Sequence, residues 1–388
     1  MTLAERERDL ENRLRSIDDP LLSDDYDHEN ETERDGATDD RADDPADIVS
    51  LGLVNDVSID GDTATISLAF NSPYAPAEMD LGNRIREVVT EAGFDPDLRA
   101  SVSAEQGFDE EIMPRVKNVI AVSSGKGGVG KTTVAANLAA GLERMGAMVG
   151  ILDSDIHGPN VPRILPIEGE PGVTPNDELV PPRSDGVRVM SMGFLTKNAD
   201  DPAILRGPMV NNIMTQFLQE VEWGVLDYLI VDLPPGTGDA TLNLLQTMPV
   251  TGAVIVTTPQ QMAVDDTRKG LRMFQEHDTP ILGVVENMST FQCPGCDDEH
   301  DLFGRDGGDD ISADYDVPLL AKLPLHPDFG AEDADGPVVK DDDSPVQEST
   351  TTLVEEIADR IGEVNRRKVA DSSSVPEAEP VPTEVGRS

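Results

Sequence analysis

Residues 123–133 read SSGKGGVGKTT. From Gly125 onward they match G-x-x-x-x-G-K-[ST], the pattern of loops that bind the phosphates of a nucleoside triphosphate. The apolar run at 119–122 predicts a buried parallel strand before the loop, and residues 134–144 predict a helix after it. Because strand, loop and helix follow one another as the pattern requires, a glycine-rich turn that binds nothing is the weaker interpretation.

The residue types in this loop predict how it holds a nucleotide. Glycines let backbone N–H groups turn towards a polyphosphate, and the helix that follows presents its positive end to the same anion. Lys131 is expected to reach the β- and γ-phosphates, and the Thr132 hydroxyl is expected to bind Mg²⁺. The predicted ATP contacts in the loop are Gly125, Lys126, Gly127, Gly128, Val129, Gly130, Lys131, Thr132 and Thr133.

Polar side chains stand at the carboxyl ends of three other predicted strands. Asp153 and Asp155 end the segment ILDSD, and Asp232 ends an apolar strand that leads into a Pro-Pro-Gly turn. Ligands of an open parallel sheet bind at the carboxyl ends of its strands, so these carboxylates are expected near Mg²⁺ and the phosphates. A solvated acidic loop is the alternative for Asp153 and Asp155. Asn287 also follows a strand, and its amide could bond an adenine edge.

The cysteines are Cys293 and Cys296, in the sequence FQCPGCD. A C-x-x-C pair can be half of a zinc site, a redox pair or two ligands of an iron–sulfur cluster. A four-ligand centre would require both cysteines from each of two subunits related by a twofold axis. Redox chemistry of the thioredoxin type is the weaker interpretation, because there the motif opens a helix in a small βαβ domain.

The charge of the chain limits its partners. Its 388 residues include 76 acidic and 30 basic side chains, for a net charge of −46. This composition predicts an acidic surface of the halophilic type and argues against partners that need a basic footprint, namely nucleic acid and anionic membrane. The first twenty residues are charged and no apolar run is long enough to span a bilayer, so we expect a cytoplasmic protein without a signal peptide.

The fold class predicted from these patterns is α/β: a P-loop NTPase with a doubly wound parallel sheet, preceded by a small N-terminal α+β domain. We expect the small domain at 1–104, with a disordered acidic insertion at 23–46. A linker at 105–115, the ATPase domain at 116–366 and a disordered tail at 367–388 complete the expected organisation.

Periodicity predicts the individual elements. In the small domain we expect helices at 4–17 and 79–92 and strands at 48–57, 63–70 and 99–103. In the larger domain we expect strands at 119–122, 148–152, 187–190, 228–232, 253–257, 281–286 and 319–323. Helices are expected at 132–144, 209–220, 240–247, 265–275 and 346–366.

The chain resembles the Mrp/ApbC family of iron–sulfur cluster carrier ATPases, within the MinD/ParA-like superfamily. The matching segments are GKGGVGKTT at 125–133, LDSDIHGPN at 152–160, RGPM at 206–209, VDLPPGTGD at 231–239, ENMSTFQCPGC at 286–296 and LPLHP at 323–327. RGPM and CPGC distinguish this family from partitioning and septum-placement ATPases. The N-terminal part resembles the small iron–sulfur assembly domain often fused to these proteins, although Ala75 stands where many relatives carry cysteine.

The resemblance implies a homodimeric ATPase that carries a [4Fe–4S] cluster on Cys293 and Cys296 of both subunits. It implies that Lys126 reaches across the dimer to the partner's nucleotide, that Asp153 lies near the metal and that Asp155 orients the attacking water. The family's asparagine at the position of Asn287 contacts the base. Apo iron–sulfur proteins are the implied acceptors, and a scaffold protein is a candidate donor.

Three alternatives remain open at this point. A MinD/ParA-like spatial-organisation ATPase would need a membrane or DNA attachment, for which the C-terminus lacks a basic amphipathic helix. A structural zinc could replace the cluster between the subunits. Electron transfer driven by ATP, as in the nitrogenase iron protein, would share the fold and a bridging cluster.

Overall fold

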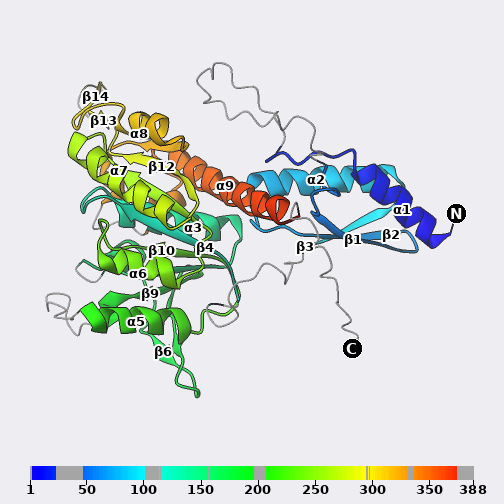
Figure 1. The fold of residues 1–388 in the computed structure, drawn as a ribbon, viewed down its shortest axis with the longest axis horizontal. Coiled ribbons are helices and arrows are strands. Elements are labelled where there is room, and N and C mark those ends of the chain that lie inside the picture. Colours follow the sequence, from blue (N-terminus) through cyan, green and yellow to red (C-terminus); the bar gives the residue numbers. More distant parts are fainter. Residues whose placement is uncertain are drawn as a thin grey trace, which may run out of the picture.

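The computed structural model describes residues 2–22, 47–100, 113, 115–155, 158–195, 207–293, 296, 298–330 and 336–373. A large α/β part and a smaller module at one end of the molecule are joined by a long helix (Figure 1). The expected insertion at 23–46 lies outside the described residues, as do most of the expected linker at 105–115 and residues 374–388 of the expected tail.

A mostly parallel sheet forms the centre of the large part. Its strands are β4 (Val116–Ser124), β5 (Val149–Asp153), β8 (Arg183–Ser184), β9 (Val187–Ser191), β10 (Leu226–Asp232), β11 (Gly252–Thr257), β12 (Ile281–Asn287) and β15 (Leu319–Leu323). They are ordered β15-β12-β11-β4-β10-β5-β9-β8, and every neighbouring pair is parallel except β8 with β9. The expected doubly wound parallel sheet is therefore confirmed.

Helices cover both faces of this sheet, as the continuous apolar strands require, since β4, β5 and β10 bury nearly every residue. The helices are α3 (Lys131–Met145), α4 (Val161–Ile164), α5 (Gly207–Gln219), α6 (Asp239–Thr247), α7 (Gln261–Glu276), α8 (Gly307–Tyr315) and α9 (Gln347–Ser373). One core cluster joins the sheet to α3 and α9, and a second joins its other face to α5, α6, α7 and α8.

The small module packs two helices on a three-stranded sheet. Its elements are α1 (Leu3–Leu14), β1 (Val54–Asp60), β2 (Thr63–Leu68), α2 (Pro76–Glu91) and β3 (Asp95–Ala100). β1 and β2 form an antiparallel hairpin that turns at Asp60-Gly61, and β3 joins β2 in parallel. Leu10, Ile66 and Leu81 belong to its separate core, so this module has its own apolar interior.

Two predicted strands of the module are shifted in the structure. The strand expected at 48–57 begins only at Val54, because residues 48–52 form a turn. Gly52 adopts a left-handed φ of 71°, and the Asp47 carboxylate accepts hydrogen bonds from Val49 N and Ser50 N at 3.1 and 2.9 Å. The strand expected at 99–103 lies earlier, at β3.

Helix α9 joins the two parts and runs beside α2 (Figure 1). It continues to Ser373, so the expected tail at 367–388 begins as helix. Within the large part it packs so closely on α3 that a Cβ on Gly141 would come 2.6 Å from Val354. Near the middle of α9, Asp359 accepts a hydrogen bond from Ala77 N of the small module, at 2.9 Å.

Other buried contacts seal this junction between the parts. The Tyr228 hydroxyl lies 2.9 Å from Ser72 Oγ and donates to the Pro73 carbonyl at 2.8 Å. Asn118 Nδ2 donates to the Asn71 carbonyl at 2.7 Å. Among the helices of the described residues, none is both long and apolar enough to cross a lipid bilayer.

Candidate nucleotide and thiol sites

The register of the parallel sheet gathers the predicted nucleotide residues at one edge. Asp232, the last residue of β10, is paired with Asp153 of β5 on one side and with Val122 of β4 on the other. The phosphate-binding loop starts just beyond Val122, and α3 starts at Lys131. The carboxyl ends of three adjacent strands therefore meet where the sequence predicted them to meet.

Asp232 is the centre of this site, which we call the nucleotide site. Its two carboxylate oxygens accept separate hydrogen bonds, one from Lys131 Nζ and one from Thr132 Oγ1 at 2.7 Å. Lys131 and Asp232 form a buried ion pair, with 6% and 0% of their side chains exposed. Burial raises the pKa of Asp232 although the charge and hydrogen bond of Lys131 oppose the shift.

Asp153 is wholly buried beside this pair. It accepts hydrogen bonds from Ser191 Oγ at 3.0 Å and from Val161 N at 3.1 Å. Burial, and then repulsion from Asp232, raise its pKa to about 7. Two neighbouring carboxylates whose ionisation is disfavoured in this way fit a divalent cation, because Mg²⁺ would offset both the burial and the repulsion.

Asp155 and Lys126 lie at the margin of the site. Burial is the main cause of the raised pKa of Asp232, and the negative charge of nearby Asp155 adds to it. Asp155 Oδ1 also accepts a hydrogen bond from Gly158 N at 3.2 Å. Lys126 Nζ donates to Gln260 Oε1 of the same chain at 2.9 Å, which holds the lysine at the mouth of the loop beside the start of α7.

The backbone of the loop is held in place by close neighbours. A Cβ on Gly125 would lie 2.5 Å from Thr267 N of α7. Gly130 has a φ of 89°, and a Cβ there would overlap the Asn287 amide. Asn287 Nδ2 donates to the Val129 carbonyl at 2.9 Å, so the structure places this amide on the loop itself.

Gly127, Gly128 and Thr133 complete the predicted loop residues. Gly127 and Gly128 are exposed, and no atom lies within 4 Å of the position where a Cβ would stand on either. Thr133 lies in the first turn of α3, and its carbonyl accepts a hydrogen bond from Asn137 Nδ2 at 2.9 Å. The glycines thus present open backbone on the side of the loop away from the protein core.

The cysteines stand on a small surface hairpin formed by β13 (Phe291–Gln292) and β14 (Glu299–His300). We call β13, β14, Cys293, Cys296 and Asp298 the thiol hairpin. Cys293 N donates to the Asp298 carbonyl at 2.9 Å, and Cys296 N donates to the Cys293 carbonyl at 3.3 Å. Cys296 is exposed and Cys293 is partly buried, so the pair is accessible from outside the protomer.

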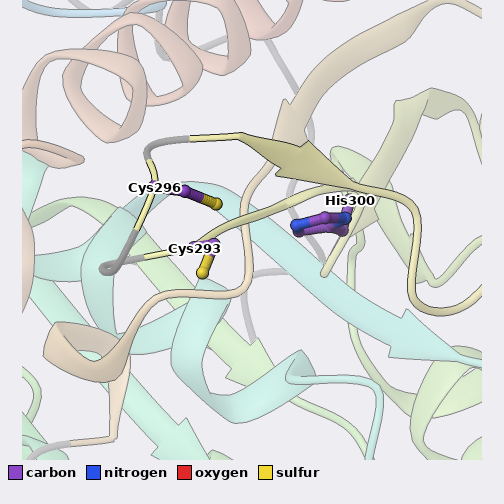
Figure 2. Close-up of side chains that lie close together, drawn as sticks. All are labelled: Cys293, Cys296 and His300. Carbon is purple, nitrogen blue, oxygen red and sulfur yellow. The ribbon is translucent and has the colours of Figure 1, made fainter.

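His300, which the sequence analysis did not identify, lies beside the two cysteines. One ligand atom from each of Cys293, Cys296 and His300 lies within 4.8 Å of the others (Figure 2). The histidine stands across the hairpin from Phe291, so its proximity depends on strand register. A C-x-x-C followed closely by histidine was the signal in the sequence.

Three further residues that the sequence analysis did not identify hold the residues of these sites in position. Gln260 holds Lys126, and Ser191 holds Asp153. Glu286 is wholly buried; its oxygens accept hydrogen bonds from Ser289 Oγ and Gly308 N, each at 2.6 Å. It thereby ties the segment that leads to the thiol hairpin to the start of α8.

Comparison with known proteins identifies the family of the chain. A ParA-type family model described as NUBPL iron-transfer P-loop NTPase matches residues 115–359. An iron-sulfur cluster carrier protein of Synechocystis sp. is 43% identical over 327 residues, or 81% of this chain and 92% of the relative. The iron-sulfur cluster transfer protein NUBPL of Dictyostelium discoideum is 41% identical over 261 residues, or 66% of this chain and 80% of the relative.

A solved structure has a similar fold. A nucleotide-binding protein from Archaeoglobus fulgidus, in complex with ADP, is 37% identical and superposes with a TM-score of 0.50. The match covers 59% of this chain and 89% of that chain. These findings confirm the predicted fold class and the resemblance to iron–sulfur cluster carriers. The chain belongs to the family of NUBPL iron-transfer P-loop NTPases.

Proposed function

We propose that the protein is a homodimeric ATPase that carries a [4Fe–4S] cluster and delivers it to apo iron–sulfur proteins. The observation that carries the proposal is the short path between the two sites. Asn287 bonds the phosphate-binding loop, and the same chain continues directly into the thiol hairpin that bears Cys293. A change of the loop on ATP binding or hydrolysis therefore has a direct covalent route to the thiols.

The nucleotide site supplies the groups that ATP hydrolysis needs. Lys131 would bind the β- and γ-phosphates, and Thr132 with Asp232 would hold Mg²⁺, which neutralises phosphate charge when bound. Lys131 and Thr132 already contact Asp232, so nucleotide binding would exchange those bonds for bonds to phosphate and metal. Asp155 would orient the attacking water, with Asp153 near the metal.

The remaining residues of the loop and its surroundings complete the nucleotide contacts. We propose that backbone N–H groups of residues 125–133 bind the phosphates and that Lys126 exchanges Gln260 for the partner's nucleotide in the dimer. Asn287 would read the base from its place on the loop. Slow turnover is expected, since the nucleotide then acts as a switch between two arrangements of the dimer.

Cluster binding requires two protomers. Each offers two thiolates, so a twofold dimer supplies the four thiolates of a [4Fe–4S] cluster. On transfer, an acceptor thiolate would form a new iron–sulfur bond as the bond to Cys293 or Cys296 breaks, and the released thiolate would take up the proton lost by the acceptor. No electron moves in this exchange, so no oxidant or reductant is needed.

The small module is proposed to guide partners, including a donor scaffold. Ala75, at the position where the resemblance places a cysteine in many relatives, is wholly buried against the core of the large part. A thiol at this position would be enclosed, so the module contributes no ligand there. Its firm attachment through α9 and Tyr228 would hold a docked partner at a fixed position relative to the nucleotide site.

Anaerobic reconstitution with iron and sulfide tests the proposal. The wild-type protein is expected to gain the iron and acid-labile sulfide of one [4Fe–4S] cluster per dimer and to pass them to an apo-acceptor in an ATP-dependent reaction. Cys293→Ala should lose the cluster and keep ATP binding, whereas Lys131→Ala should lose ATP binding and keep the cluster.

Two results would contradict the proposal. One is a full cluster on Cys293→Ala, which would remove the ligand assignment. The other is a monomeric wild-type protein that stays free of iron and sulfide under every loading condition. Co-sedimentation with liposomes or DNA, without a cluster, would instead identify a spatial-organisation ATPase.

A further inference from the structure

The thiol hairpin contains more ligand atoms than a bridging cluster uses. Four cysteines from two protomers satisfy the four irons of the proposed cluster, which leaves both copies of His300 unused. Yet His300 lies with both cysteines in one chain, with ligand atoms no more than 4.8 Å apart. We infer that one protomer by itself binds a single divalent transition-metal ion through Cys293, Cys296 and His300.

The strand pairing explains why the histidine belongs to this group. Phe291 is paired with His300, so these two side chains emerge on the same face of the hairpin. Side chains alternate along a strand, and Cys293, two residues after Phe291, therefore lies on that face as well. The turn between the strands is closed by the bond from Cys296 N to the Cys293 carbonyl, which brings the second thiol back over the first. Figure 2 shows the three side chains gathered on the hairpin.

The donor set matches a borderline-soft divalent ion such as Zn²⁺. Zinc binds cysteine sulfur at about 2.3 Å and histidine nitrogen at about 2.0 Å, which places tetrahedral ligand atoms roughly 3.5–3.8 Å from one another. A contraction of about 1 Å in an exposed hairpin reaches that geometry. Two thiolates and one imidazole fill three positions and leave the fourth open, and binding releases the two thiol protons.

This single-ion site would compete with the cluster, because both need the same two thiolates. A protomer loaded with one ion would have no thiolate available for the bridging cluster. The inference uses the cysteines of the proposed function but does not depend on it, since the single ion needs neither a second protomer nor inorganic sulfide.

Titration of the reduced, full-length protein with Co²⁺ in the absence of oxygen tests the inference. Cobalt on a tetrahedral thiolate site has characteristic visible absorption, so it reports ligand set and stoichiometry together. We expect one Co²⁺ per chain, and Zn²⁺ should displace it. His300→Ala should weaken Co²⁺ binding by roughly 100-fold, since loss of even an outer-shell partner costs about 10- to 100-fold. His277→Ala, which removes another exposed histidine, is the matched control and should bind as the wild type does.

Three results would overturn the inference. Half a Co²⁺ per chain, with His300→Ala binding unchanged, would show that four cysteines of a dimer hold the ion. Undiminished Co²⁺ binding by His300→Ala at any stoichiometry would exclude the histidine as a ligand. Loss of the reconstituted iron–sulfur cluster in His300→Ala, with the cluster retained in His277→Ala, would show that the histidine is needed for the cluster.

The outcomes separate this inference from the proposed function. A wild-type protein that binds Co²⁺ through His300 but never gains iron with sulfide would leave the single-ion site standing and end the cluster proposal. If the wild-type protein gains the cluster and His300→Ala binds Co²⁺ normally, the cluster proposal would stand and the single-ion site would be rejected.

Discussion

The nucleotide site and the junction between the two parts both bury a cation among carboxylates, but their hydrogen bonding differs. In the nucleotide site, Lys131 and Thr132 each satisfy one oxygen of Asp232. At the junction, Arg366 of α9 lies 2.8 Å from Asp19 Oδ1 and 3.7 Å from Glu78 Oε1. We call Asp19, Glu78 and Arg366 the junction cluster.

The junction cluster is incompletely bonded. Asp19 Oδ2, Glu78 Oε2 and both Nη atoms of Arg366 are buried without a hydrogen-bond partner. An ion pair of this kind contributes little net stability when intact and costs much when one partner is removed. The nucleotide site, in contrast, lies at an open loop where its bonds can be exchanged for a ligand. One buried charge cluster is therefore suited to binding and the other to holding two parts in one relative position.

The largest expected effect comes from Lys131→Ala. The phosphate charge in the transition state would lose its principal cation, so ATP hydrolysis should fall by about a thousandfold. A radioactive or coupled assay of phosphate release measures this. Lys269→Ala, an exposed lysine of α7, is the control and should retain the wild-type rate. Hydrolysis within tenfold of the wild type would contradict the assignment of Lys131.

Arg366→Ala should have the next largest effect, and on stability. Asp19 and Glu78 would remain buried without their cation, which costs about 3–5 kcal/mol in the free energy of unfolding. Urea titration measures the loss, and ATP affinity should not change. The neighbouring Arg367→Ala removes a side chain that is 66% exposed and should cost little. Equal losses in the two variants would show that the junction cluster has no structural role.

Glu78→Gln should change how stability depends on pH. Burial raises the pKa of Glu78 from 4.5 to about 7, while Arg366 and the N–H groups of Ser72 and Asn71 oppose the shift. The folded wild type keeps this proton up to about pH 7 while the unfolded chain loses it near pH 4.5. The wild-type free energy of unfolding therefore falls as pH rises through that range and levels off above it.

The glutamine variant lacks this titration. Its stability relative to the wild type should improve by about 3 kcal/mol between pH 4.5 and pH 8, in urea titrations at both values. Glu348→Gln on the exposed start of α9 is the control for the change of charge. A stability difference that stays constant with pH would place the pKa of Glu78 near its ordinary value.

The smallest expected effect is that of Tyr228→Phe. The variant loses the contacts of the hydroxyl with Ser72 Oγ and the Pro73 carbonyl, worth about 1–2 kcal/mol of unfolding free energy. Tyr315→Phe, with one long contact of 3.4 Å, is the matched control. Because β10 carries both Tyr228 and Asp232, a change in ATP affinity in this variant would show that the junction between the two parts is coupled to the nucleotide site.

Much of the fold and half of the site could be predicted from the sequence because the signals are local. The phosphate-binding loop is one continuous segment between a strand and a helix, and Asp153 and Asp232 each end an apolar strand. Parallel strands bring such ends together without further information. The nucleotide site is therefore a consequence of topology.

The residues that were missed depend on distant pairing. His300 meets the cysteines only through the register of a short hairpin. Asp19, Glu78 and Arg366 are far apart in the chain, and nothing near any of them marks it as buried. The adenine contact predicted for Asn287 stays a prediction, because its amide bonds the loop carbonyl of Val129 in the structure.

Helix α9 packs on α3 at Gly141 within the core of the large part, and its Asp359 accepts a hydrogen bond from Ala77 N of the small module, so it contacts both parts. The two parts are thus held together by these noncovalent contacts and do not depend on the chain connection between Ala100 and Met113. A protease that cut the chain there would yield two fragments that migrate as one particle on gel filtration and melt in one transition. Removal of the chain from Gln347 onward would instead expose the apolar face of the large part that α9 covers, remove its buried polar contacts with the small module, and cause the product to aggregate.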